Sequence, residues 1–294
     1  MSLCIISAPS SLGLWPSGVQ DLGRTLLGHG LGERLSAPLV REIVPAVYVR
    51  EKDDVTGYLN GPAIRAMALE MAQAVSDGLA DGHMPLILGG DCSVLHGALL
   101  ALRRVERPGL FYMDGHADFY DGAGTHSGEV ADMGLAIATG HNHGLLSDID
   151  GLSPYVRPTD AVCYGFRDER EAAADGSPSP RGTGIGLFDL GRLRRQGTDA
   201  CLAEAVRLVS RPDLGRIWVH FDTDVIDNAL NPAVDYPLPS GLHWEEAVEA
   251  IAAIRATGRM AGLSVTIFNP RKDLDGRIAM ALTDGLVAAL TRPI

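Results

Sequence analysis

Short apolar segments alternate with helical patterns along the chain, and this alternation restricts the folds that the sequence can adopt. Six segments of four to seven residues are almost continuously apolar and are bounded by Gly, Pro or Asp, which is typical of strands: residues 3–7, 85–88, 109–113, 161–164, 217–220 and 262–268. Continuous apolar character suits strands that are covered on both faces, as in a parallel sheet.

Helical periodicity fills much of the sequence between these segments. Helices are predicted at residues 61–82, 94–105, 244–256 and 283–290, and residues 172–186, rich in Ala, Gly, Ser and Pro, are predicted to form a surface loop. Alternating strands and helices indicate an α/β fold with a mostly parallel sheet. In such sheets ligands bind beyond the carboxyl ends of the strands, so polar residues that follow apolar segments form the candidate site.

The composition excludes several functional classes. The 294 residues include 37 acidic and 25 basic side chains, a formal net charge of −12, and no run of basic residues, so neither nucleic acid nor an anionic membrane is an expected partner. No uninterrupted apolar run reaches the roughly 18 residues that a membrane span needs. The four cysteines include no CxxC pair, which predicts no disulfide framework and a reducing, cytoplasmic location.

Three of the predicted strands end in clusters of side chains that commonly bind metals. Alternate spacing turns the members of a cluster to one side of an extended backbone. Four carboxylates in proximity raise each other's pKa, and a divalent cation removes that conflict. A single pair of alternate aspartates is more often part of a turn or a helix cap. The three clusters together, however, predict a metal site, and carboxylates with one imidazole favour Mn²⁺ as the metal. The side chains are Cys92 in the first cluster, Asp114, His116 and Asp118 in the second, and Asp222 and Asp224 in the third.

The three clusters resemble the motifs of the arginase/agmatinase, or ureohydrolase, family, which read roughly GGDHS, DAHxD and DxDxxDP. The corresponding segments are GGDCS at residues 89–93, DGHAD at 114–118 and DTDVID at 222–227, in the same order and with the same spacing. The resemblance covers nearly the whole chain and implies a three-layer α/β/α fold and a homo-oligomer, commonly a trimer or hexamer. Because the three segments have to converge, we predict a single domain over residues 1–294.

The resemblance also implies two Mn²⁺ ions per chain. In the family, a hydroxide that bridges the ions attacks the guanidinium carbon, and Asp118 would orient it. The implied ligands are Asp114 and Asp222 as bridges, Asp118 and Cys92 for one ion, and His116 and Asp224 for the other.

Position 92 departs from the family pattern, which usually has a His ligand there. A thiolate from Cys92 is softer, so it would weaken Mn²⁺ binding, favour Zn²⁺, Fe²⁺ or Co²⁺, or leave one ion only. The alternative is an inert buried thiol beside an ion with fewer ligands. At least one hydroxyarginine-hydrolysing branch resembles the family with Cys here, so the change does not by itself imply lost activity.

Three further departures concern the substrate. The glutamate that grips the guanidinium in the family aligns with Ile267, a neighbouring Thr aligns with Tyr236, and the His thought to shuttle protons aligns with Ala131. A charged ligand that loses its buried carboxylate partner loses a few kcal/mol of binding, which disfavours L-arginine as the substrate.

Three explanations for these departures remain open. Another carboxylate, Glu129 or Asp121, has taken over; the substrate is a less basic amidino, formimino or hydroxyguanidino compound, or an amide; or the protein binds without turnover. His126 is a candidate for the missing proton shuttle, and the alternative is an exposed loop histidine.

The sequence therefore predicts a Mn²⁺-dependent hydrolase that cleaves a linear C–N bond of a small guanidino- or amidino-type compound, with Asp118 and His126 as catalytic residues. One alternative is a non-catalytic ureohydrolase homologue that binds a metabolite. A metal-dependent amidase or deacetylase is the other.

Overall fold

The structure, a computed structural model of the chain, describes residues 2–122, 125–142 and 144–292. Within these ranges, an 8-stranded sheet has the order β2-β1-β3-β8-β7-β4-β5-β6, and each neighbouring pair is parallel. The strands are β1 (Ser2–Ser7), β2 (Leu39–Glu42), β3 (His83–Leu88), β4 (Gly109–Met113), β5 (Ala161–Tyr164), β6 (Gly186–Phe188), β7 (Ile217–Asp222) and β8 (Met260–Thr266).

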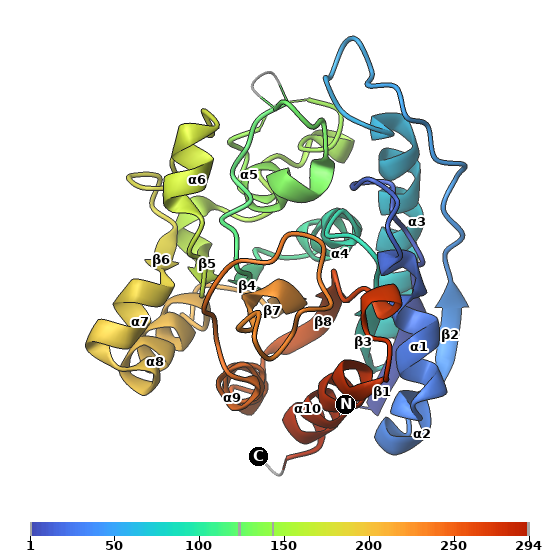
Figure 1. Cartoon of the computed structure of the whole chain (residues 1–294), viewed down its shortest axis with the longest axis vertical. Coiled ribbons are helices and arrows are strands. Elements are labelled where there is room, and N and C mark those ends of the chain that lie inside the picture. Colours follow the sequence, from blue (N-terminus) through green and yellow to red (C-terminus); the bar gives the residue numbers. More distant parts are fainter. Residues whose placement is uncertain (1, 123–124, 143, 293–294) are drawn as a thin grey trace.

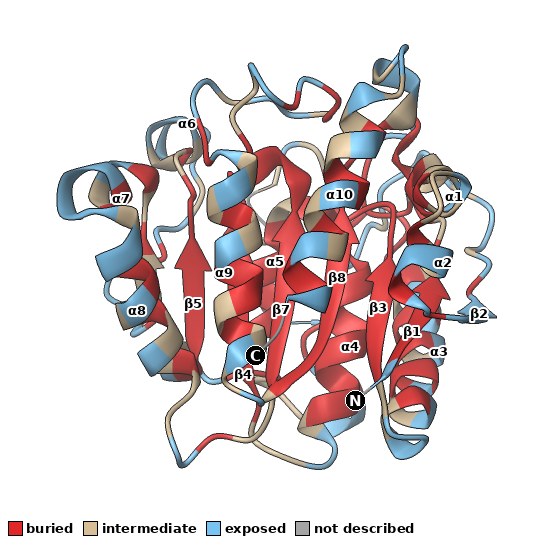
Figure 2. Ribbon diagram, turned by 90° about the horizontal axis from the view of Figure 1, so that it is seen from below, coloured by how far each residue is buried: buried red, intermediate tan, exposed pale blue. Residues whose placement is uncertain are grey.

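Helices cover both faces of this sheet, which gives three layers (Figures 1 and 2). Helices α3 (Gly61–Ala80), α4 (Val94–Arg103) and α5 (Gly134–Ala138) contribute to the hydrophobic cluster on one face. The other face packs against α1 (Leu22–Gly28), α2 (Leu31–Leu35), α7 (Leu190–Gln196), α8 (Thr198–Val209), α9 (Trp244–Ala256) and α10 (Arg277–Thr291). The remaining α-helix in the described ranges, α6 (Glu169–Ala174), has no buried residue. The predicted α/β/α class with a parallel sheet is confirmed.

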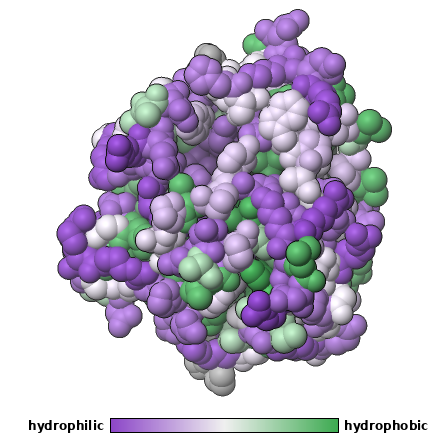
Figure 3. Space-filling view, viewed as in Figure 1, coloured by the Kyte–Doolittle hydropathy of each residue, from purple (hydrophilic) through white to green (hydrophobic). Residues whose placement is uncertain are grey.

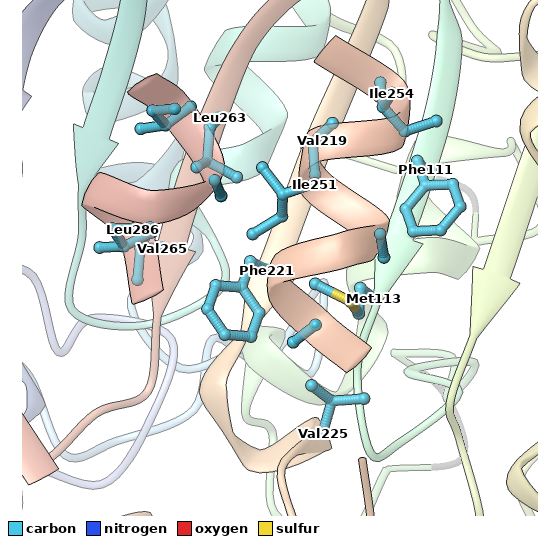
Figure 4. Packing of buried hydrophobic residues seen from close by; sticks show 14 of the residues in the cluster. Phe111, Met113, Val219, Phe221, Val225, Ile251, Ile254, Leu263, Val265 and Leu286 are labelled. Carbon is cyan, nitrogen blue, oxygen red and sulfur yellow. The ribbon is translucent and has the colours of Figure 1, made fainter. Parts of the chain in front are cut away.

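The strands are buried on both faces, which explains their continuous apolar sequences. Val219 and Phe221 of β7 pack with Ile251 of α9 on one face (Figure 4), whereas Trp218 belongs to the cluster on the α3/α4 face. Because successive side chains of a strand alternate between faces, His220 and Asp222 are directed to the α3/α4 side as well. On one face of β7, Val219 and Phe221 pack in the hydrophobic core. On the other face, the buried Trp218 is followed by the polar residues His220 and Asp222.

Local sequence patterns located most of these elements, with some errors. The predictions at 109–113, 161–164 and 244–256 match β4, β5 and α9. The final helix begins at Arg277 rather than at 283, and the predicted loop at 172–186 is partly wrong, because α6 extends into it and β6 begins at Gly186. The short strands β2 and β6 have no clear strand pattern in their sequences. In β2, all four residues are exposed.

Candidate metal centre

The strand order places the three sequence clusters beside one another. Strands β3, β8, β7 and β4 are neighbours, and all point the same way, so their carboxyl ends meet at one edge. A pocket of about 440 Å³ opens at this edge, and the face shown in Figure 3 is hollowed and mainly hydrophilic around it. All six predicted metal ligands line the pocket: Cys92, Asp114, His116, Asp118, Asp222 and Asp224.

Two groups of side chains have the spacing that a metal ion requires. In the first, ligand atoms of Cys92, Asp114, His220 and Asp222 all lie within 4.8 Å of one another, and all four residues are buried. In the second, the same limit holds for Asp114, His116 and Asp224. Asp114 belongs to both groups, as expected of a residue that bridges two ions.

His220 is a candidate that no sequence motif indicated. It stands inside an apolar strand, where a lone histidine gives no motif, but it precedes Asp222 by two residues and therefore shares its face of the sheet. Asp118, in contrast, was predicted as a ligand from the sequence, and it lines the pocket but belongs to neither group.

The loop that carries Cys92 is fixed by close backbone packing. A Cβ atom on Gly90 would lie 1.7 Å from the Ser10 carbonyl oxygen, so only glycine fits there. The Asp91 carboxylate accepts hydrogen bonds from Ser10 Oγ at 2.7 Å and from the Ser93 amide at 2.9 Å. These contacts hold Cys92 against the end of β7, where its Sγ donates to Asp222 Oδ2 at 2.8 Å.

The backbone also orients the carboxylates. Asp114 Oδ1 accepts from the His116 amide at 2.7 Å, and Asp222 Oδ1 accepts from the Asp224 amide at 2.8 Å. Each of these bonds uses one oxygen of the carboxylate and leaves the second oxygen of the same carboxylate for another contact. Asp114 Oδ2 is buried without a hydrogen-bond partner in the described structure, and so is His220 Nε2.

The electrostatics of the site fit a bound cation. Burial, and then the charge of Asp224, raises the pKa of Asp114 to about 7. Burial and the neighbouring carboxylates also raise the pKa of Asp118 and of Asp222 well above the ordinary value. Burial acts on Asp224 in the same direction, but His116, whose Nδ1 lies 2.9 Å away, lowers its pKa overall. A divalent cation would ionise these groups and supply a partner for the orphaned atoms.

Asp118 is held by a tyrosine from inside the sheet. The Tyr112 hydroxyl donates a short hydrogen bond to Asp118 Oδ2, and both residues are buried. Asp118 has φ of 45°, a left-handed conformation that few residues other than Gly, Asn and Asp adopt readily. Asp118 is thus fixed both by its backbone and by its side chain.

One wall of the pocket is apolar and carries Ile267. Ile267 packs with Cys92, Leu14 and Ala131, and its φ is 70°, an outlier for a β-branched residue. Such strain is retained where the surroundings enforce it, and it is common at functional sites. The position that aligns with the family glutamate is therefore apolar and conformationally constrained.

Glu129 lines the pocket and lies close to this wall, because it precedes Ala131 by two residues. Its Oε1 accepts from the Trp15 amide at 2.7 Å, and its Oε2 accepts from the Tyr236 hydroxyl at 2.6 Å. Glu129 lines the pocket, whereas Asp121, the other sequence candidate, is outside the described lining residues. His126 lines the pocket from an exposed loop, and Lys52 donates to its carbonyl oxygen.

The model of the arginase family matches residues 30–291 of the chain. The chain belongs to the arginase family. The resemblance of the three sequence clusters to this family, the ureohydrolases, is thereby confirmed. None of its described helices is long and apolar enough to span a membrane.

Known members of the arginase family are similar to it over most of their length. The arginase of Brevibacillus brevis is 28% identical over 221 residues, which are 72% of each chain, and that of Bacillus caldovelox is 27% identical over 297 residues, 97% of each. The solved arginase of Bacillus caldovelox superposes with a TM-score of 0.90 at 24% identity, covering 100% of this chain and 99% of that one. The formimidoylglutamase of Bacillus subtilis follows at 0.74 and 16%, covering 98% and 86%. At these identities the structures show the fold.

Proposed function

We propose that this protein is a divalent-metal-dependent hydrolase that cleaves a linear C–N bond of a guanidino or amidino compound. The proposal rests on one observation: two groups of potential metal ligands share Asp114, and Asp114 lines the pocket. A pair of divalent cations in such a site lowers the pKa of a water molecule toward neutrality and polarises the group under attack. The proposed ligands are those predicted from the sequence: Cys92, Asp114, His116, Asp118, Asp222 and Asp224.

Asp118 is the proposed catalytic residue. Its Oδ2 accepts from Tyr112, so the carboxylate is held in one orientation with its other oxygen available to the pocket. In that position it would accept a proton from the attacking water and pass it to the leaving nitrogen. His126, on the exposed loop at the pocket, is the proposed group that exchanges this proton with solvent.

The charge of the pocket favours a cationic substrate that has no carboxylate. Besides the metal-binding residues, six acidic side chains line it, and none of its described lining residues is Lys or Arg. A substrate carboxylate would meet repulsion without a cationic partner of the protein, whereas a positively charged end would be stabilised. The six are Glu129, Asp132, Asp168, Glu171, Asp175 and Asp235.

Glu129 is the proposed replacement for the missing guanidinium-binding glutamate. Burial raises its pKa, and a bound cation would reverse that shift by stabilising the carboxylate. Its two oxygens are already oriented by Trp15 and Tyr236, and each keeps a further lone pair for a planar amidinium or guanidinium group.

A substrate screen tests this function. Metal-loaded protein is assayed for ammonia or urea release from agmatine, guanidinobutyrate, arginine, hydroxyarginine and formiminoglutamate. We expect carboxylate-free agmatine to be turned over in preference to the four acids, and the Asp118→Asn variant to be inactive. No turnover of any compound with metal bound would instead support the non-catalytic alternative.

The remaining expectations are also proposals. We propose Mn²⁺ as the physiological metal of the Asp114, His116 and Asp224 group, because its ligands are two carboxylates and one imidazole. A single domain over residues 1–294, a homo-oligomeric trimer or hexamer and a cytoplasmic location complete the proposal. The four cysteines, which are all free and buried, support a reducing compartment.

A further inference from the structure

A buried histidine lies beside the predicted metal ligands without belonging to any of their motifs. His220, in the middle of β7, has no exposed surface. Its Nδ1 lies 2.9 Å from Ser264 Oγ of β8, and its Nε2 is buried with no hydrogen-bond partner in the described structure. A buried polar atom without a partner is unfavourable and uncommon, so this nitrogen requires an explanation.

Its location supplies that explanation. A ring nitrogen of His220, the Sγ of Cys92 and carboxylate oxygens of Asp114 and Asp222 lie within 4.8 Å of one another. Asp114 Oδ2 is a second buried atom of this group that lacks a partner. Four buried residues, in β7 and in the segments that follow β3 and β4, thus bring their donor atoms together, and two of these residues have an orphaned atom.

The contact with Ser264 is compatible with the form of imidazole that can bind a metal. When the proton resides on Nδ1 and is donated to Ser264 Oγ, Nε2 carries the free lone pair of the ring. Metal-binding histidines usually have their second nitrogen held in this way, because it fixes the orientation of the ring. Tyr112 stacks on the His220 ring with 4.7 Å between centroids, which further restricts its rotation.

The set of donor atoms differs between the two groups. The Cys92 group offers one sulfur, one nitrogen and two carboxylates, a softer donor set that suits Zn²⁺. The group around His116 offers one nitrogen and two carboxylates, which suit a harder ion such as Mn²⁺. A sulfur ligand alone would leave the first ion without the nitrogen that the family's usual histidine supplies.

We propose that His220 is a ligand of the ion held by Cys92, that it restores the nitrogen lost with the family histidine, and that this ion is Zn²⁺. The proposal deepens the metal-dependent function above and rests on it. The protein would then hold two different metals, with the softer one at the Cys92, Asp114, His220 and Asp222 group.

Metal binding to the full-length protein tests the proposal without an assay of activity. After removal of metals, Zn²⁺ affinity is measured by competition with a chromophoric chelator for the unmodified chain, His220→Asn and His96→Asn. His96 is a matched control, because it is another fully buried histidine whose ring nitrogens lack partners in the described structure, and it lies outside both groups. We expect His220→Asn to lose at least about tenfold in affinity and His96→Asn to stay within about threefold.

Cobalt substitution gives a spectroscopic readout of the same site. Co²⁺ in the unmodified chain should show a sulfur charge-transfer band and strong visible bands of a four- or five-coordinate ion. His220→Asn should keep the sulfur band and lose visible intensity, whereas His220→Cys should retain it. Unchanged Zn²⁺ affinity and unchanged visible bands in His220→Asn would overturn the proposal.

X-ray absorption covers the case in which the His220 variants fail to fold. In His116→Asn loaded with one equivalent of Zn²⁺, the remaining imidazole of the two groups is that of His220. We expect one sulfur at about 2.3 Å and one imidazole nitrogen at about 2.0–2.1 Å, and a spectrum with sulfur but no imidazole would refute the role of His220. Failure of the unmodified chain to bind any divalent ion would refute the metal-dependent function itself.

Discussion

Cys92 Sγ donates a hydrogen bond to Asp222 Oδ2, with 2.8 Å between the two atoms. The contact joins the first and third sequence clusters, which are separated by 130 positions. Burial, and then the charge of Asp222, raises the pKa of the Cys92 thiol well above its ordinary value. The thiol therefore stays protonated until a cation displaces its proton, and metal binding at this position should release protons.

Restoring the histidine of the family should change the metal preference of the site. In Cys92→His we expect Mn²⁺ affinity to rise about tenfold and Zn²⁺ to lose its advantage, because a harder nitrogen replaces sulfur. Cys92→Ser is the matched control and should weaken both ions. The measurement is metal content after dialysis against equal concentrations of Mn²⁺ and Zn²⁺. Equal metal ratios in Cys92→His and the unmodified chain would show that Cys92 is no ligand.

Removal of the Asp118 carboxylate should abolish turnover without unfolding the protein. We expect Asp118→Asn to lower kcat by at least about a hundredfold, because a general base is lost. Tyr112→Phe, which removes only the hydrogen bond to Asp118, should lower kcat by about tenfold with little change in KM. Steady-state kinetics and thermal unfolding on the same samples check this. A kcat for Asp118→Asn near that of the unmodified enzyme would contradict the assignment.

Glu129 should act on substrate binding rather than on chemistry. Glu129→Gln preserves the shape of the side chain and removes its charge, so we expect KM for a cationic substrate to rise by about tenfold or more. Tyr236→Phe should have a smaller effect, since it only removes the donor to Glu129 Oε2. Comparison of agmatine with a neutral amide substrate is the check. An equal loss for both substrates would argue against a charge effect.

Introducing a carboxylate at position 267 should increase activity toward guanidinium compounds. Ile267 lies on the apolar wall beside Cys92, where the family has its guanidinium-binding glutamate. We expect Ile267→Glu to raise kcat/KM for arginine or agmatine by about tenfold, and Ile267→Gln, which has the same size, to leave it unchanged. A gain of similar size in both variants would point to relief of backbone strain at this residue instead.

Glu246 should stabilise the fold in a way that depends on pH. It accepts hydrogen bonds from Arg194, Thr198 and the His243 amide, so it ties the start of α9 to α7 and α8. Burial alone would raise its pKa, but the bond to Arg194 and the others lower it to about 2 from 4.5. A lowered pKa means that the stabilisation is present above pH 4.5 and disappears as the pH falls through 2.

Urea unfolding of Glu246→Gln tests this linkage. We expect the variant to lose about 1–2 kcal/mol of unfolding free energy at pH 7, with the difference vanishing near pH 2. Glu245→Gln is a control at an exposed neighbour and should change stability by less than about 0.5 kcal/mol. A loss in Glu246→Gln that is the same at both pH values would exclude the charge as its cause.

The central strands, the principal helices and five of the proposed ligands, at the carboxyl ends of β4 and β7, could be predicted from the sequence alone. These features are local: continuous apolar segments, helical periodicity and carboxylates at alternate positions are visible within a few residues of one another. Cys92 was also recognisable, because GGDCS keeps the remainder of the family motif. The strands β2 and β6 gave no such pattern, since all four residues of β2 are exposed and β6 has three residues, of which only Phe188 is buried.

Two further residues of the site, His220 and Glu129, became apparent only from long-range contacts in the fold. His220 joins the ligands because β7 lies between β4 and β8 and turns it toward Cys92, and Glu129 meets Tyr236 across 107 positions. In the sequence, His220 is one polar residue within an apolar strand and Glu129 is one acid among 37. The order of strands in the sheet depends on how long-range packing buries both faces, and that order places His220 beside Cys92, whereas Glu129 reaches the pocket from a loop.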